Sequence, residues 1–250
     1  MLRRQGELLA DAAERAGLDA AVPPCPPWQV RDLLRHTGYV HRWAARHVTE
    51  RPAQVIDGPS EAEILCGGAP DSELLAWFRA GHAALAETLA TADPTLEYAT
   101  FIAAPSALAF WARRQAHETA IHRADAESAA GTAPEYLADF AADGVDELIM
   151  GFGRRRKYQP AAGTDGSLLH VLATDTGDAW SVEAHEGRLQ PRRDANDDAA
   201  DGAGCTVSGL ASGVYLYLWN RLDAAQAGVT VTGDPGLLAS WQASVRVRWN

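Results

Sequence analysis

The sequence predicts an α+β fold in two domains, a helical bundle followed by a smaller mixed domain. The first 155 or so residues contain long segments whose apolar residues recur three and four positions apart, which is typical of amphipathic helices. From Ser167 onward, short β-rich segments alternate with turn residues and short helical patterns. This change of pattern indicates a separate α+β domain. A chain of 250 residues is long enough to give both domains a core.

Five helices are expected in the N-terminal part, and the short connections between most of them indicate antiparallel neighbours. Gly17 ends the first helix, and Pro27 is well placed to start the second. The expected ranges are 1–17, 28–49, 71–91, 106–130 and 135–152. Residues 51–70 are rich in Pro, Gly and acidic residues without clear periodicity, so they are expected to form a loop with one short turn at 61–65.

The C-terminal part is expected to begin with a β-hairpin. Segments 167–173 and 179–185 are β-rich, and the turn residues Asp175-Thr-Gly-Asp178 lie between them. An acidic loop at 194–204, a strand at 205–208, a helix at 210–222, a strand at 229–232 and a final helix after Pro235 follow. We therefore expect a helical bundle at 1–157 and a small α+β domain at 158–250.

Composition excludes several classes of function. The chain has 22 Lys and Arg against 33 Asp and Glu, and no basic stripe interleaved with aromatic residues, so nucleic acid is not an expected partner. No apolar run reaches the ~18 residues that a membrane helix needs, and no signal peptide is recognisable. A cytoplasmic protein without a membrane partner is expected. Three widely spaced cysteines, Cys25, Cys66 and Cys205, indicate neither a disulfide framework nor a cysteine-rich metal site.

The helix expected at 106–130 carries charged groups beside bulky apolar ones. Residues four apart on a helix lie on the same side, so Glu118 and His122 point in one direction, with Arg114 and Asp125 on or beside that face. A carboxylate and an imidazole can both bind zinc if a third ligand arrives from elsewhere. The alternative is a weak surface pair, because Glu and His are often four apart on helices.

His117 gives this helix a false likeness to the helical zinc-protease signature. That signature has two histidines four apart with a glutamate between them, whereas His117 and His122 are five apart. Two side chains five apart lie roughly 140° apart around the helix and do not easily bind one metal ion. His117 is therefore excluded from the candidate ligands.

His36 lies on the apolar face of the helix expected at 28–49. It shares that face with Leu33, Val40, Trp43 and His47, which are spaced three and four residues apart. A single histidine on an apolar face is more often a core residue than a ligand. Both interpretations remain open from the pattern alone.

Three stretches carry a resemblance to a known family. They are the run from Val22 to His36, the run from Arg113 to Asp125, and Trp219-Asn-Arg221 with Val231-Thr-Gly-Asp234. In this order they resemble the mycothiol-dependent maleylpyruvate isomerase family, over nearly the whole chain. The chain departs from the family pattern at Pro27 and at Asn220, where glycine is more usual.

The resemblance implies a DinB-like metal-binding bundle joined to a domain similar to sterol carrier protein 2. It also implies metal ligands at His36, Glu118 and His122, and an activity-determining Arg221 facing a cleft between the domains. A ligand set of two histidines and a glutamate leaves one position open, as in catalytic zinc sites. Two cofactors are expected. One is a divalent metal ion, which we expect to be zinc, and the other is mycothiol, whose thiol the metal would hold as a thiolate.

The function expected from this resemblance is a metal-dependent isomerase or thiol S-transferase. Its partners would be a small electrophilic molecule and a low-molecular-weight thiol, and Arg221 with Arg114 would hold an anionic group of the substrate or the thiol. Two alternatives are a metal-dependent hydrolase that needs no thiol and a ligand-binding protein in which the metal is only structural. A hydrolase would be active without thiol, whereas the thiol-dependent enzyme would not. In the ligand-binding protein the spectrum of the metal would not respond to thiol, whereas in the thiol-dependent enzyme it would.

Overall fold

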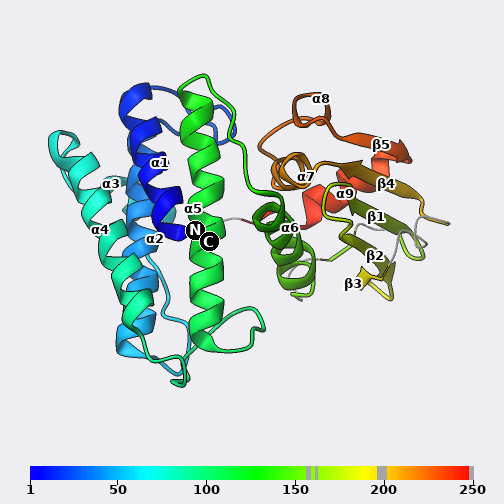
Figure 1. The fold of residues 1–250 in the computed structure, drawn as a ribbon, viewed down its shortest axis with the longest axis horizontal. Helices are drawn as coiled ribbons and strands as arrows, with labels where there is room; N and C mark the ends of the chain where they lie inside the picture. The colour runs from blue at the N-terminus through cyan, green and yellow to red at the C-terminus, as the bar shows by residue number, and fades with distance from the viewer. Residues whose placement is uncertain (156–158, 161–162, 196–201, 248–250) are drawn as a thin grey trace. The chain divides into compact units, whose positions relative to one another are not determined.

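The computed structural model describes residues 1–155, 159–160, 163–195 and 202–247 (Figure 1). The chain divides into two compact units, of which the first spans Met1–Pro134 and the second begins at Glu135. The helical unit followed by a unit with a mixed five-stranded sheet confirms the predicted α+β fold class. None of the described helices is both long and apolar enough to cross a lipid bilayer.

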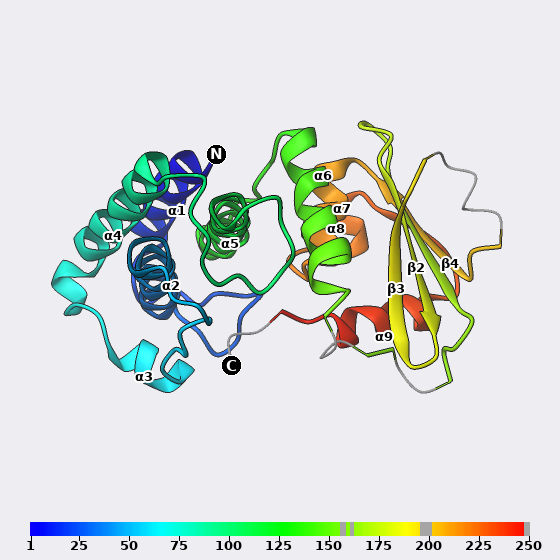
Figure 2. The ribbon, with the colours of Figure 1, turned by 90° about the horizontal axis from the view of Figure 1, so that it is seen from below.

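The first unit is a bundle of four long helices and one short one, seen nearly end-on in Figure 2. The helices are α1 (Leu2–Ala16), α2 (Val30–Glu50), α3 (Glu61–Cys66), α4 (Asp71–Thr91) and α5 (Ala107–Ala129). Helix α1 packs on α5 and α4, and α2 packs on α4 and α5. The four long helices agree with the expected ranges within about two residues, and α3 replaces the short turn expected at 61–65.

Helix α5 is buried around most of its circumference, and this decides how its polar residues behave. Ser106 caps its N-terminus, and the Ser106 hydroxyl accepts a hydrogen bond from the Ala109 N–H at 3.1 Å. Polar side chains within it must find partners, because an unpaired buried polar group costs free energy. Arg123 accordingly pairs with Glu127 at 2.9 Å, and Thr119 meets His41 of α2 at 2.9 Å.

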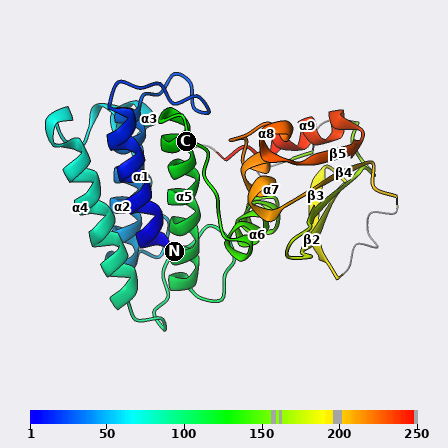
Figure 3. The same ribbon diagram turned by 45° about the horizontal axis from the view of Figure 1, so that its top comes forward.

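The second unit combines helices with a five-stranded sheet of strand order β3-β2-β1-β4-β5 (Figure 3). Its strands are β1 (Leu168–Ala173), β2 (Ala179–His185), β3 (Arg188–Asp194), β4 (Cys205–Gly209) and β5 (Thr230–Gly233). Its helices are α6 (Ala138–Asp146), η1 (Glu147–Phe152), α7 (Ala211–Leu218), α8 (Ala224–Ala227) and α9 (Pro235–Ser244). Strands β1 and β4 pair in parallel, and the other pairs are antiparallel. The hairpin expected at 167–185 is therefore confirmed as β1 and β2.

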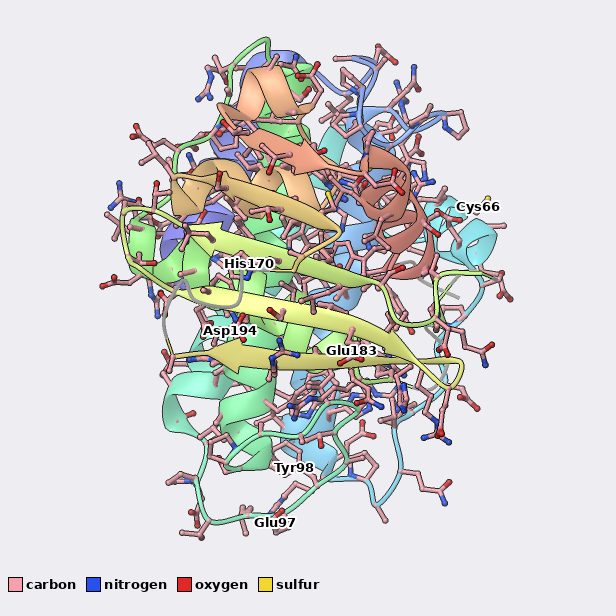
Figure 4. The ribbon with its side chains drawn as sticks, turned by 90° about the vertical axis from the view of Figure 1, so that its right-hand side faces the viewer. Cys66, Glu97, Tyr98, His170, Glu183 and Asp194 are labelled. Carbon is pink, nitrogen blue, oxygen red and sulfur yellow. The ribbon has the colours of Figure 1, made fainter. Side chains whose placement is uncertain are left out.

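The two faces of this sheet differ in character. On one face, Trp180 of β2 donates a hydrogen bond from Nε1 to Asp146 of α6 at 3.0 Å. Side chains alternate across a strand, so the residues next to Trp180 point the other way. Figure 4 shows His170, Glu183 and Asp194 on that other face. The helix carrying Asp146 therefore covers only the face that contains Trp180.

Strand β3 has no counterpart among the expected elements. Its sequence from Arg188 to Asp194 is mostly charged and contains Pro191, so it lacks the alternation of a half-buried strand. A proline is tolerated at the edge of a sheet, where β3 lies, because its missing N–H breaks no ladder on the outer side. The loop expected at 194–204 lies partly outside the described residues.

The helix expected at 135–152 belongs to the second unit. It forms α6 and then continues as the π-helical turn η1, and α6 packs on α7. The contacts divide the chain after Pro134, whereas the change of sequence pattern predicts a division after residue 157. The predicted boundary itself, between residues 157 and 158, lies outside the described residues.

Helix α7 ends four residues earlier than expected, and the cause is local. Asn220 has a φ of 60°, a left-handed conformation that stops a helix and that glycine and asparagine tolerate best. This conformation explains why asparagine is tolerated at position 220, one of the two places where the chain departs from the pattern of the family it resembles. The chain then turns, so that Arg221 follows the end of the helix.

Close packing between α6 and α7 leads to a stability prediction. A Cβ added at Gly144 would overlap the ring of Tyr215, so Gly144→Ala forces α6 away from α7. We expect a loss of about 1–3 kcal/mol in the free energy of unfolding, as is typical of an overpacked core. Denaturant unfolding monitored by circular dichroism measures it. Asp139→Ala, at an exposed position earlier on α6, is the control and should change stability by less than about 0.5 kcal/mol.

Candidate metal site

Two helices of the first unit bring His36, Glu118 and His122 together. His36 comes from α2, and Glu118 and His122 come from α5, one helical turn apart. Glu118 Oε1 lies 3.5 Å from His36 Nε2 and 3.2 Å from His122 Nε2. One ligand atom from each residue lies within 4.8 Å of the other two. The three side chains predicted as ligands therefore converge on a single point.

The spacing of these atoms fits a tetrahedral metal ion. Zinc bonds to nitrogen and oxygen are about 2.1 Å long, so two ligand atoms of a tetrahedral site lie about 3.4 Å apart. The two measured separations, 3.5 and 3.2 Å, bracket that value. Two imidazole nitrogens and one carboxylate oxygen are also donors that zinc accepts, and they leave a fourth position open. The residues present thus fit a divalent metal.

Arg114 holds the other oxygen of the Glu118 carboxylate. Its Nη2 donates a hydrogen bond to Glu118 Oε2 at 2.9 Å, and its side chain is only 3% exposed. Burial raises the pKa of Glu118, but hydrogen bonds from the two histidines and the charge of Arg114 outweigh burial and hold the pKa well below its usual value. Glu118 therefore stays ionised, with Oε1 directed toward the histidines.

Asp125 holds the outer nitrogen of His122. The aspartate is fully buried one turn further along α5, and its Oδ2 accepts a hydrogen bond from His122 Nδ1 at 2.8 Å. Burial lowers the pKa of His122, but the hydrogen bonds to Asp125 and Glu118 are stronger and raise the pKa to about 9. Metal-binding histidines commonly present one nitrogen to the metal and the other to a carboxylate. The contact of His122 Nδ1 with Asp125 fits this arrangement.

His36 differs from His122 in its electrostatics. Burial lowers its pKa, the contact with Glu118 opposes this effect, and the nearby His122 adds to it, with a net lowering. The ring is 4% exposed. Trp28 lies over both histidines, with ring centroids 4.9 Å from His36 and 6.2 Å from His122. His36 is thus neutral at pH 7 and ready to act as a ligand.

The segment before α2 supplies further contacts that the sequence analysis did not identify. Cys25 donates a hydrogen bond from Sγ to Asp125 Oδ2 at 3.5 Å, and Trp28 lies against the two histidines. The position of Asp125, three residues after His122 on the same helix face, was a usable sequence signal. Cys25 and Trp28 carried no such signal, because the contact of Cys25 with Asp125 and that of Trp28 with His122 join residues 100 and 94 positions apart.

The two arginines predicted to hold an anion occupy different surroundings. Arg114 contacts Glu118 in the first unit, where it orients the carboxylate. Arg221 lies in the second unit, and its Nη1 donates a hydrogen bond to the Trp219 carbonyl oxygen at 2.8 Å. Binding of substrate or thiol by either arginine remains a prediction.

A serine, a histidine and an aspartate also meet in the second unit, but not as a catalytic triad. Ser181 Oγ donates a hydrogen bond to Asp194 Oδ2 at 2.6 Å, and both residues lie 3.4 Å from the same nitrogen, His170 Nδ1. In a triad, the serine and the aspartate contact opposite nitrogens of the ring. This buried cluster on the sheet therefore lacks the geometry for nucleophilic attack by Ser181.

The raised pKa of His122 leads to a prediction about metal uptake. In the metal-free protein His122 keeps a proton up to about pH 9, and a metal ion must displace it, whereas His36 is already neutral. The apparent zinc affinity should therefore rise by about tenfold per pH unit between pH 7 and 9 and level off above. Competition with a chromophoric chelator, corrected for the chelator's own protonation, measures it. An affinity independent of pH over this range would contradict the assignment of His122.

Comparison with known proteins places the chain in a family. The model described as the mycothiol maleylpyruvate isomerase N-terminal domain matches residues 2–127, and that of the C-terminal domain of the same family matches residues 139–240. No curated protein matches the chain.

Two solved structures share the fold. A crystal structure of the mycothiol-dependent maleylpyruvate isomerase is 16% identical, with a TM-score of 0.56. That of a histidine-to-alanine mutant of the isomerase is 14% identical, with a TM-score of 0.59. In both comparisons the match covers 92% of this chain and 91% of the other.

The two domain models agree with the resemblance carried by the His36 and His122 motifs, and they account for both structural units. Because the first model alone matches half of the sequence, the comparison is decisive for the family. The chain belongs to the mycothiol maleylpyruvate isomerase family of enzymes.

Proposed function

We propose that this protein is a metal-dependent enzyme that uses mycothiol as the nucleophile toward a small electrophilic molecule. The observation that carries the proposal is the convergence of His36, Glu118 and His122 in a helical bundle of this family. Zinc is the metal we propose, because the donor atoms and their spacing suit it. Bound there, it would stabilise the thiol as a thiolate at neutral pH.

The charges around the site support an anionic partner. Glu118 and Asp125 contribute two negative charges and Arg114 one positive charge, while both histidines are neutral when they act as ligands. With a divalent cation the cluster has a net charge of about +1, which one thiolate neutralises. The residues therefore favour a singly charged anion over a neutral molecule in the open position.

The protein's own cysteines are not required as nucleophiles in this proposal. Cys205 is buried in β4 of the second unit, and Cys66 is exposed at the end of α3. Cys25 is the cysteine near the site, where its thiol contacts Asp125 and not a ligand atom. The positions of the three cysteines are therefore compatible with a nucleophilic thiol that enters the site from solution.

Arg221 is proposed to hold an anionic group of the substrate or of the thiol. Two outcomes then depend on the electrophile. An alkene that can isomerise adds the thiol, rotates about the bond that has become single, and releases the thiol unchanged. An epoxide, halide or activated alkene keeps the sulfur, which is S-transfer. The family favours isomerisation, and product analysis with each class of substrate decides between them.

Metal content tests the site directly. We expect about one metal ion per chain in the wild-type protein and loss of that metal in His36→Ala and Glu118→Ala, because each variant removes one of three ligands. His117→Gln changes a buried histidine on the same helix that is excluded from the ligand set, so it is the control and should keep its metal. Well-folded wild-type protein without any affinity for divalent metal would disprove the proposal.

Cobalt substitution tests the nucleophile. Adding mycothiol to the cobalt-loaded protein should produce a thiolate-to-cobalt absorption band, because the thiol sulfur occupies the open position. A spectrum unchanged by thiol, combined with hydrolytic turnover in its absence, would indicate a hydrolase. An unchanged spectrum without turnover, but with strong stabilisation by the metal, would indicate a ligand-binding protein with a structural metal.

Arg221→Ala tests the proposed anion-binding role. We expect turnover to fall about ten- to a hundredfold, the effect of losing one charged hydrogen bond, while metal content stays unchanged. Arg221→Lys retains the charge and should retain part of the activity. Loss of metal in Arg221→Ala would contradict this role, because it would mean that the residue supports the metal site and not the substrate.

A further inference from the structure

We propose that Asp125 is a positioning residue that fixes the tautomer and orientation of His122, and that Cys25 fixes the position of Asp125. The inference rests on the proposed metal site and assigns roles to two residues outside its ligand set. Its basis is a pair of hydrogen bonds, from His122 Nδ1 and from Cys25 Sγ, that share one acceptor oxygen, Asp125 Oδ2.

The first of these hydrogen bonds decides which nitrogen of His122 is available. Asp125 Oδ2 lies 2.8 Å from Nδ1, so that nitrogen carries a proton and donates it to the carboxylate. When the ring gives up its second proton to bind a metal, Nε2, which lies 3.2 Å from Glu118 Oε1, is the nitrogen with the lone pair. Without Asp125 the neutral ring could place its proton on Nε2 and lose the lone pair that faces Glu118. The carboxylate also increases the electron-donating power of the ring.

The second hydrogen bond joins this carboxylate to a different part of the chain. Cys25 donates from Sγ to the same Oδ2 at 3.5 Å, and it belongs to the segment that leads into α2. That segment is closed by backbone hydrogen bonds from Val22 N to the Trp28 carbonyl oxygen at 2.9 Å and from Trp28 N to the Cys25 carbonyl oxygen at 2.8 Å. The loop is thus held in shape by its own backbone, and it presents the thiol to Asp125.

Two ligand-bearing helices are connected through this oxygen. Helix α2 carries His36, and the loop before it carries Cys25 and Trp28, whose ring covers both histidines. Helix α5 carries His122 and Asp125. A shift of the loop would move Trp28 and the Asp125 carboxylate together. The position of Oδ2 therefore couples the orientation of His122 to the segment that positions His36.

Asp125→Asn tests the inference because it keeps the size of the side chain and removes its charge. The measurement is zinc affinity, by competition with a chelator at pH 10, for the wild-type protein and the variant. At this pH His122 is largely unprotonated in both proteins, so the lower pKa of His122 in the variant does not offset the loss. We expect a loss of ten- to a hundredfold, the usual effect of removing a carboxylate behind a metal-binding histidine.

Glu127→Gln is the matched control. It removes one buried negative charge from the same helix, two residues further on, where the carboxylate pairs with Arg123 and contacts no ligand. Its zinc affinity should stay within about twofold of wild type. Equal losses in Asp125→Asn and Glu127→Gln would overturn the inference, since they would reflect a general effect of charge or stability.

The nitrogen-15 spectrum of His122 provides a second measurement that does not depend on metal. At pH 10 in the metal-free wild-type protein, the proton should sit on Nδ1 with Nε2 unprotonated, and Asp125→Asn should lose that preference. A wild-type protein that binds no zinc would contradict the proposed function, and this spectrum would still decide the inference. Retention of the Nδ1 proton in Asp125→Asn would overturn it.

Substitutions of Cys25 test the outer contact. Cys25→Ala removes the donor and should weaken zinc binding, by less than Asp125→Asn does, because His122 keeps its own bond to the carboxylate. Cys25→Ser restores a donor and should return the affinity toward the wild-type value. If Cys25→Ala and Cys25→Ser both bind zinc as the wild type does, the role given to Cys25 is wrong.

Discussion

A single carboxylate oxygen, Glu118 Oε1, is the point on which the first unit is organised. It contacts nitrogen atoms of His36 on α2 and of His122 on α5, in a bundle interior where an unpaired charge would be costly. Arg114 neutralises the other oxygen of the same carboxylate. The burial of these groups is tolerated because each has a charged or hydrogen-bonding partner. The packing of α2 on α5 therefore sets the geometry of the candidate site, and neither can change without the other.

The same requirement for partners extends along α5. Because this helix is buried on nearly every side, its polar residues pair in sequence: Arg114 with Glu118, His122 with Asp125, and Arg123 with Glu127. Such pairs contribute little to stability when exposed, but breaking one inside a protein leaves an unpaired charge. The first two pairs thus hold the candidate ligands Glu118 and His122 in place, whereas the Arg123–Glu127 pair lies outside the candidate site.

Membership of the isomerase family gives this arrangement a chemical meaning. A ligand set of two histidines and one glutamate leaves room for one more donor, and among the described residues this group includes no cysteine. Catalysis by an external thiol requires that combination, because a protein thiolate in the fourth position would block it. Cys25, close enough to contact Asp125 but not the ligands, belongs to the support of the site.

The sequence by itself determined the fold class, four long helices, the β1–β2 hairpin and the shared face of Glu118 and His122, because each of these follows from local periodicity or turn residues. It also carried the family motifs. It did not determine β3, whose edge position alone permits Pro191, or the place of residues 138–152 in the second unit. Only the tertiary structure decided that His36 meets Glu118, that Arg114 orients this carboxylate, and that Cys25 reaches Asp125. The contact of His36 with Glu118 joins residues 82 positions apart, and that of Cys25 with Asp125 joins residues 100 positions apart. Such contacts depend on which side chains the packed helices bring face to face, and no local sequence pattern encodes that packing.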